Sequence, residues 1–109
     1  MKDYKPFIGK FYMPPHSCIC LVIDIYKQLY QKDLSSDVVL AMEYLRAHMD
    51  QVVTPMEGDL ILLKGAQWHV GIVVADGEMI HTFPDGSVGL ERYDGFIWGN
   101  RIRGFFRWK

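Results

Sequence analysis

The chain has 109 residues, of which 50% are hydrophobic and 14% aromatic, and its formal net charge is −1. This length suits one domain that can bury a core without disulfides. The balanced charge excludes the broad cationic field that attracts a phosphate backbone, so we expect no nucleic acid partner. A small basic cluster near the end of the chain is interpreted as a solvated strand face: Arg101, Arg103, Arg107 and Lys109.

The sequence offers no obvious targeting or membrane segment. Its opening residues hold no apolar run of signal-peptide length. The longest uninterrupted apolar stretch, residues 18–23, is far shorter than the roughly 20 residues that span a bilayer. We therefore expect a soluble chain without a leader. Cys18 and Cys20 point in different directions on a helix and cannot bridge each other, which fits a reducing compartment.

Two helices are predicted in the first half of the chain, after an irregular, proline-rich arm over residues 1–16 that we expect to pack on the domain. The first helix begins at Ser17, a favoured N-cap, and continues to about Tyr30. The second begins at Ser35 or Ser36. It extends to about residue 49, with a core stripe at helical spacing: Val38, Met42, Leu45 and Met49.

From the turn at residues 54–59 onward, the hydrophobic period changes to two. This pattern predicts strands at residues 59–64, 68–74, 78–83, 87–93 and 101–108. Helices that precede an antiparallel meander of strands are typical of an α+β fold.

The cysteines offer a candidate nucleophile. Cys18 falls in the first turn of the predicted helix, where the macrodipole favours the thiolate and lowers the thiol pKa. It could equally be a small buried hydrophobe, and its position alone does not decide. Cys20, about 200° further round the helix, is assigned a packing role. The C-x-C spacing and scattered histidines predict no metal site or cofactor: His16, His48, His69 and His81.

Two histidines interrupt adjacent apolar strands. If the connecting loop is the pair at residues 76–77, His69 and His81 lie on opposite faces of the sheet. If the loop is the triplet at residues 75–77, Gly71 lies opposite His81 and both rings project the same way. A catalytic pair requires the second register, and the turn sequence alone does not choose between them.

With that register, three side chains supply a nucleophile, a base and an orienting group: Cys18, His69 and His81. His69 would accept the thiol proton and return it to the leaving amine. His81 would fix the tautomer of His69, and the backbone N–H of Cys18 could help to hold an oxyanion.

Several segments resemble those of a known family: "GKFY", "SCICLVIDIY", "GDLILL", "HVGIVVADGEMIH" and "ERYDGFIWGNRIRGFFR". Together they resemble the NlpC/P60 cysteine peptidases, in particular the short form encoded among bacteriophage tail genes. The resemblance implies a papain-like α+β fold, with N-terminal helices packed on an antiparallel β-meander or half-barrel. It also implies one catalytic domain over residues 1–109 that hydrolyses peptidoglycan stem peptides, typically next to D-glutamate and diaminopimelate.

The resemblance also assigns roles to residues. It places the nucleophile at Cys18, the base at His69 and the third polar residue at His81, with Tyr12 and Ser17 in supporting or substrate-binding roles. Four positions depart from the family pattern, which has Asp, Gly and a glycine pair where this chain has Ser17, Cys20 and Pro14-Pro15. These changes keep the catalytic atoms but alter the expected substrate fit at the helix tip.

The expected partners are cell-wall peptidoglycan and other tail proteins, in a virion tail or in the bacterial cytoplasm before assembly. An alternative is a structural or assembly component of a tail tip, for which an exposed patch of Phe105, Phe106 and Trp108 would mark an interface. A third interpretation, a thiol hydrolase or acyltransferase of permuted order, places the cysteine after the histidines. No cysteine follows Cys20, which disfavours it.

Overall fold

A computed structural model describes residues 2–34 and 42–109. The elements, in chain order, are η1 (Lys5–Phe7), α1 (Ser17–Tyr30), α2 (Met42–His48), β1 (Met49–Val52), β2 (Leu60–Lys64), β3 (Trp68–Ala75), β4 (Glu78–Thr82), β5 (Val88–Arg92), η2 (Gly99–Arg101) and β6 (Ile102–Trp108). This is the α+β fold that the sequence predicts, and β2 to β6 match the predicted strands to within about one residue at each end.

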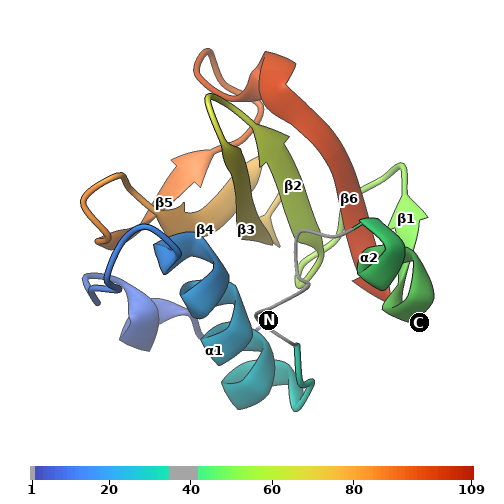
Figure 1. Cartoon of the computed structure of the whole chain (residues 1–109), viewed down its shortest axis with the longest axis horizontal. Coiled ribbons are helices and arrows are strands. Elements are labelled where there is room, and N and C mark those ends of the chain that lie inside the picture. Colours follow the sequence, from blue (N-terminus) through green and yellow to red (C-terminus); the bar gives the residue numbers. More distant parts are fainter. Residues whose placement is uncertain (1, 35–41) are drawn as a thin grey trace.

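The strands form one six-stranded antiparallel sheet in the order β1-β6-β2-β3-β4-β5 (Figure 1). The predicted meander is correct from β2 to β5 and wrong for the last strand. β6 returns to the opposite side of the sheet, where Phe106 pairs with Leu60. Its other edge pairs with β1, a strand that the sequence did not predict, because the second helix was expected to extend to about residue 49 and the turn to begin at residue 54.

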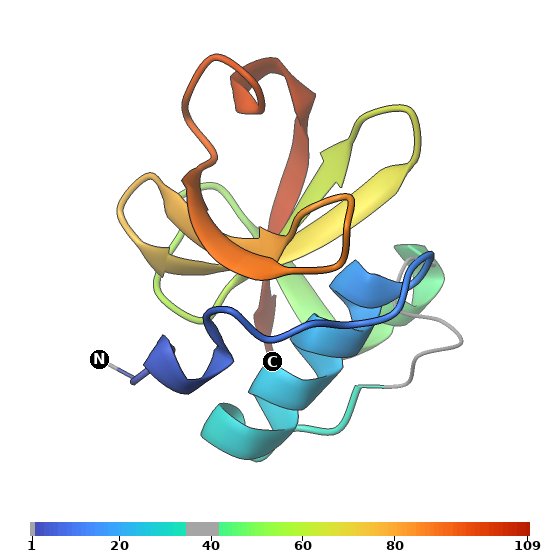
Figure 2. The same cartoon turned by 90° about the vertical axis from the view of Figure 1, so that its left-hand side faces the viewer.

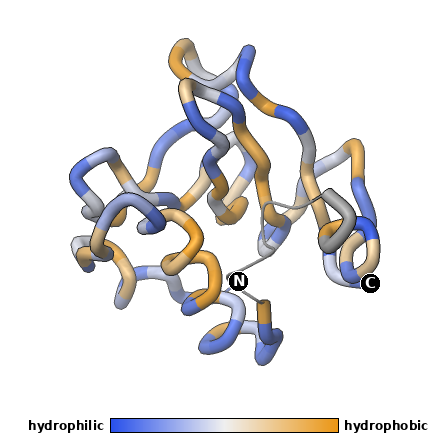
Figure 3. The backbone as a smooth tube through the Cα atoms, viewed as in Figure 1, coloured by the Kyte–Doolittle hydropathy of each residue, from blue (hydrophilic) through white to orange (hydrophobic). Residues whose placement is uncertain are grey.

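The core lies between α1 and the sheet. Four neighbouring residues of α1 are fully buried against β3 and β4: Leu21, Val22, Ile25 and Tyr26. The opposite face of the sheet holds a second cluster: Ile61, Leu63, Val73, Met79 and Tyr93. Burial on both faces explains why β2 and β3 are nearly continuous apolar runs. Figure 3 shows hydrophobic residues concentrated on α1 and on the central strands.

The N-terminal arm runs alongside α1 and the β5 end of the sheet (Figure 2). Its backbone bonds to the start of β5: the N–H of Gly9 donates to the carbonyl of Val88, and the N–H of Val88 donates to the carbonyl of Lys10. Phe7 is 2% exposed in the core. These contacts hold the arm against the domain and so fix the course of the chain up to the start of α1.

The start of α1 differs from the prediction in one respect. The helix begins at Ser17, but the N-cap position belongs to His16, whose side chain makes no capping bond. Ser17 is instead the first helical residue, buried, with its hydroxyl 3.1 Å from that of Thr82 on β4. This bond ties the helix tip to the sheet.

The predicted second helix is α2, which ends at His48. Its proposed start at Ser35 or Ser36, Val38 and the side chain of Met42 lie outside what the structure describes. Leu45 and Met49 are buried as predicted, although Met49 belongs to β1. Across the described residues, no helix has the length and apolarity needed to cross a membrane.

The basic cluster near the end of the chain is solvated at Arg101, Arg103 and Lys109, which are exposed as expected, but Arg107 is half-buried. The guanidinium of Arg107 binds both carboxylate oxygens of Asp59, at 2.9 and 2.8 Å, and Asp59 is 1% exposed. Phe106 is buried in the core, and Phe105 and Trp108 pack against the two apolar clusters. The exposed patch considered for these three aromatic residues is therefore absent.

Candidate active site

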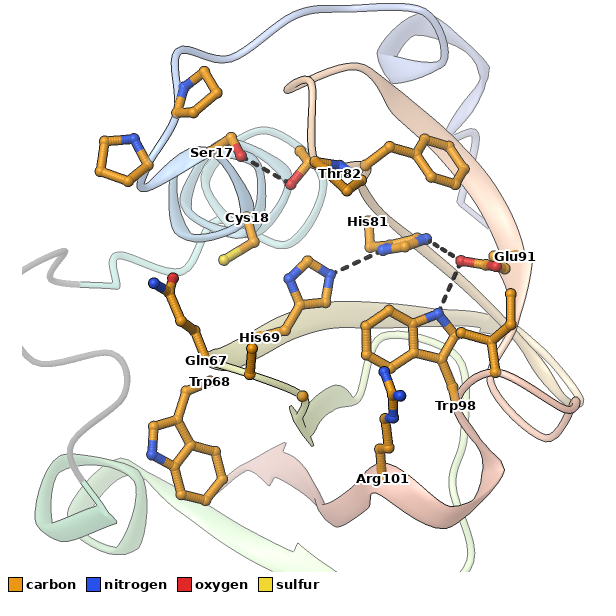
Figure 4. A pocket seen from close by; sticks show the side chains of 17 residues that line it. Ser17, Cys18, Gln67, Trp68, His69, His81, Thr82, Glu91, Trp98 and Arg101 are labelled. Carbon is orange, nitrogen blue, oxygen red and sulfur yellow. Dashed lines mark hydrogen bonds and ion pairs between the residues drawn. The ribbon is translucent and has the colours of Figure 1, made fainter.

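A cleft of about 580 Å³ lies between the tip of α1, strands β3 and β4, and the loop before β6. Cys18 reaches it from the first turn of α1, His69 from β3 and His81 from β4 (Figure 4). The structure thus brings together the three side chains that the sequence analysis selected.

A β-bulge produces the register that puts both histidines on one face. Ala75 pairs with Glu78, which leaves a two-residue turn, but Val73 pairs with Met79. Val74 is the extra residue, and it restores the alignment that a three-residue loop would give. The register that a catalytic pair requires is therefore present, but a bulge produces it and not the three-residue loop considered in the sequence analysis.

The two imidazoles are joined directly. Nε2 of His69 lies 2.9 Å from Nδ1 of His81, and the rings meet edge to face with centroids 5.1 Å apart. The thiol of Cys18 points toward the other side of the His69 ring, where Nδ1 lies (Figure 4). His69 is thus placed between the sulfur and the second imidazole.

Cys18, His69 and His81 form a row of side chains, and two further residues, Glu91 and Trp98, continue it beyond His81. Nε2 of His81 lies 2.8 Å from Oε1 of Glu91 on β5, a close contact that is not aligned as a hydrogen bond and would be an ion pair only with a protonated imidazole. The indole N–H of Trp98 donates to the same oxygen at 2.9 Å. The Trp98 ring also stacks on His69, with centroids 5.3 Å apart and planes 12° from parallel.

Sequence reasoning missed Glu91 and Trp98. The signal for Glu91 lies in the β4–β5 pairing, in which Met79 is opposite Glu91. Residues 79 and 81 share a face of β4, so Glu91 projects toward the histidines. Trp98 lies in a loop between β5 and η2, and no periodicity could have placed it.

Burial controls the charge of the histidine pair. Desolvation, followed by repulsion from His81, lowers the pKa of His69 to about 4. Desolvation also lowers the pKa of His81, although attraction to Glu91 acts in the opposite direction. Both imidazoles are therefore neutral at neutral pH, and a neutral imidazole can accept a proton.

The thiol of Cys18 does not behave as expected from its position at the helix tip. Cys18 is 8% exposed, and this burial raises the pKa of its thiol above the ordinary value of 9.0. Backbone hydrogen bonds, that with Val70 first among them, lower the pKa but do not outweigh desolvation. The expected lowering of the pKa is therefore wrong for the free site, which holds a thiol beside a neutral imidazole.

The remaining predicted residues occupy different places. Cys20 is exposed, so its assigned packing role is wrong. Tyr12 does not line the cleft; its hydroxyl donates to Asp24 on α1 at 2.7 Å. Ser17 lines the cleft, but its hydroxyl is engaged with Thr82.

The other two histidines lie away from the site. His16 is exposed at the N-cap of α1 and His48 is exposed at the end of α2, and neither lines the cleft. Within the described ranges 2–34 and 42–109, no group of three or more His, Cys, Asp or Glu side chains could hold a metal ion.

A cysteine in the first turn of a helix, facing an imidazole that a second polar side chain holds, is an arrangement typical of thiol hydrolases. Comparison with protein families agrees: the model of the NlpC/P60 family matches residues 12–107. The chain therefore belongs to the NlpC/P60 family. Its members are generally cysteine peptidases or amidases, which indicates a peptidoglycan-hydrolase-like function. A search of curated proteins finds no match.

Proposed function

We propose that the protein is a cysteine peptidase that hydrolyses amide bonds in the stem peptides of peptidoglycan. Cys18 is the nucleophile, His69 is the general base and His81 orients His69. The observation that carries this proposal is the arrangement around His69, whose Nε2 lies 2.9 Å from His81 while Cys18 points toward its other side (Figure 4).

The proposed reaction has two halves. Nδ1 of His69 takes the thiol proton as the sulfur of Cys18 attacks the carbonyl carbon of the scissile amide. The tetrahedral intermediate collapses, the C–N bond breaks, and His69 gives its proton to the departing amine. Water, deprotonated by His69, then attacks the thioester, which releases a carboxylic acid and restores the thiol. The backbone N–H of Cys18 stabilises the oxyanion in both halves.

The electrostatics of the site support general-base catalysis from a neutral pair. Burial raises the pKa of the Cys18 thiol and lowers the pKa of His69. The proton therefore rests on sulfur until the substrate arrives, and it moves during the attack. A base with a pKa of about 4 is unprotonated throughout the neutral range, so it is always available.

The cleft also suits a peptide that carries carboxylates. Arg101 lines it, with the guanidinium carbon 5.8 Å from the centre of the Trp98 ring. Trp68 and Ile97, which are 43% and 56% exposed, provide apolar surface on the same cleft. Stem peptides with D-glutamate and diaminopimelate would present both carboxylates and aliphatic chain to this surface.

Hydrolysis of purified cell walls tests the proposal. The wild-type protein is expected to release new amino groups, and mass spectrometry of the soluble fragments would identify the cleaved bond. Cys18→Ala and His69→Ala are expected to reduce release to the background rate. Cys20→Ser, which changes an exposed thiol on the same helix, is the matched control and should retain activity. Equal release by Cys18→Ala would contradict the proposal.

We further propose that the enzyme acts on a phage or phage-like tail, on the basis of its resemblance to the short tail-gene form. A second candidate function is a structural component of a tail tip, which one observation favours. Phe96 is fully exposed and Ile97 is 56% exposed, so adjacent apolar side chains are available to a protein partner. Mass spectrometry of purified particles, combined with the wall assay, separates the two: a structural component would be present on particles without wall hydrolysis.

A further inference from the structure

The histidine pair does not end the row of polar side chains that begins at Cys18. We propose that Glu91 is a positioning residue whose carboxylate fixes which nitrogen of each histidine carries the proton, leaving Nδ1 of His69 free to receive the proton of Cys18. This inference rests on the proposed function, because it assigns Glu91 a part in the same reaction.

The first step of the argument is the contact between Glu91 and His81. Oε1 of Glu91 lies 2.8 Å from Nε2 of His81, and the side chains are 24% and 2% exposed. An ionised carboxylate can only accept hydrogen bonds. If Nε2 carried a lone pair instead of a proton, two electron-rich atoms would face each other at this distance in a poorly solvated site. The proton of His81 therefore resides on Nε2.

The second step follows from the chemistry of a neutral imidazole, which has one donor and one acceptor nitrogen. Burial lowers the pKa of His81 and so favours its neutral form. With Nε2 protonated, Nδ1 of His81 is an acceptor, so Nε2 of His69 donates to it across 2.9 Å. Neutral His69 then has no proton on Nδ1, the nitrogen on the side of Cys18 (Figure 4).

The third step is the support that holds Glu91. The indole N–H of Trp98 donates to the same oxygen that contacts His81, at 2.9 Å. The Trp98 ring also stacks on His69. The side chain of Trp98 therefore contacts both the carboxylate of Glu91 and the imidazole of the general base, His69.

The basic residue next to Glu91 in sequence does not compete for its carboxylate. The closest basic residue along β5, Arg92, points its guanidinium to Asp94, with Nε and Nη2 at 3.0 and 2.8 Å from the two carboxylate oxygens. Successive side chains of a strand project to opposite faces, which also separates Arg92 from the histidines.

The tautomers can be observed directly in the full chain. In ¹⁵N-histidine-labelled wild-type protein at pH 7, two-bond ¹H–¹⁵N spectra are expected to show the proton on Nε2 in both His69 and His81. Glu91→Gln keeps an acceptor oxygen and should keep this pattern. Glu91→Leu removes the acceptor and should give a mixture of tautomers. Glu78→Leu, the same change on neighbouring β4 at the hairpin end, is the control and should match the wild type.

Two results would overturn the proposal: a proton on Nδ1 of either ring in the wild type, or unchanged spectra in Glu91→Leu. Thermal melts establish that each variant is folded. If Glu91→Leu does not fold, Glu91→Ala replaces it, and the wild-type tautomers remain decisive. The spectra need no substrate, so they decide the role of Glu91 even if the wild-type protein fails to hydrolyse cell walls.

Kinetics provide the second readout. Loss of the group that directly orients a triad histidine lowers kcat by about 10⁴-fold. Glu91 acts through His81, so we expect a smaller loss for Glu91→Leu, on the order of 10- to 100-fold in kcat, with KM within about twofold. Glu91→Gln should stay within about fivefold of the wild type because it keeps the acceptor. An equal loss in both variants would show that charge, and not tautomer control, matters.

Discussion

Gly71 lies across from His81 on the neighbouring strand, and this position has no room for a side chain. A Cβ atom at residue 71 would lie 2.9 Å from the carbonyl oxygen of Ile80 and 3.2 Å from the Cβ of His81. The absence of a side chain at Gly71 lets β3 and β4 approach closely enough for the two imidazoles to meet. Gly71 therefore permits the strand spacing that the contact between His69 and His81 requires.

Gly71→Ala should displace His81 and separate it from His69. We expect a destabilisation of roughly 1–3 kcal/mol from the overpacked contact, and a loss of activity on the order of 10- to 100-fold because the base is misoriented. Thermal unfolding and wall hydrolysis measure the two effects. Gly95→Ala is the control, since its Cβ would meet Arg92 at an ordinary 3.6 Å. Wild-type activity in Gly71→Ala would contradict this account.

The pH dependence of activity should reflect the buried state of His69. Its pKa of about 4 means that the ring becomes protonated, and loses its function as a base, only as the pH falls through about 4. The acidic limb of kcat/KM should therefore lie near pH 4 instead of near the usual histidine value of 6.5. A limb near 6.5 would show that the ring is not desolvated in solution.

Trp98→Ala should move this limb to higher pH. Desolvation is the main cause of the low pKa of His69, and the stacked indole of Trp98 contributes to that desolvation. NMR titration of His69 in the variant should show a raised pKa. Trp68→Ala is the comparison, because the Trp68 ring packs beneath the ammonium of Lys64. An unchanged pKa in Trp98→Ala would exclude the indole as the shield.

Alkylation should distinguish the two thiols. Cys20 is exposed, whereas Cys18 is buried with a raised pKa, so iodoacetamide should label Cys20 first at neutral pH. Labelling of Cys18 should accelerate as the pH rises above the ordinary thiol value of 9.0. Mass spectrometry of tryptic peptides, with Cys20→Ser as a single-thiol control, measures both rates. Fast labelling of Cys18 at neutral pH would instead reveal a stable thiolate.

The bond between Ser17 and Thr82 should stabilise the helix tip. Ser17→Ala or Thr82→Val leaves one buried hydroxyl without its partner, which costs about 1–3 kcal/mol. The double variant removes both hydroxyls and should be less destabilised than the sum of the single variants. Denaturant unfolding measures the three differences. Additive losses would show that the two hydroxyls do not interact.

Much of this molecule could be predicted from local pattern. The period-two segments located β2 to β6, and the apolar run after Ser17 located α1. The histidines of β3 and β4 were selected because polar rings interrupt apolar strands, which is a local signal. Local pattern could not reveal the partner of β6, because pairing between distant strands depends on tertiary packing.

The errors at the site have physical causes as well. The pKa of Cys18 was expected to fall because a helix start favours the thiolate, but the depth of burial depends on neighbours remote in sequence. Cys20 was assigned to the core because the run around it is apolar, yet the helix turns this position toward solvent. Glu91 and Trp98 were missed because their contacts exist only once β4, β5 and the following loop have come together.

The bulge at Val74 uncouples the spacing of the two histidines along the chain from the register of their strands. His69 and His81 are 12 positions apart, and one of the intervening residues has no partner across the ladder. Deleting Val74 should leave Ala75 opposite Glu78 and Val73 opposite Met79, so both imidazoles would keep the same face of the sheet. The hairpin should therefore tolerate the loss of this one residue, whereas a slip of the register by one residue would turn one imidazole to the far side.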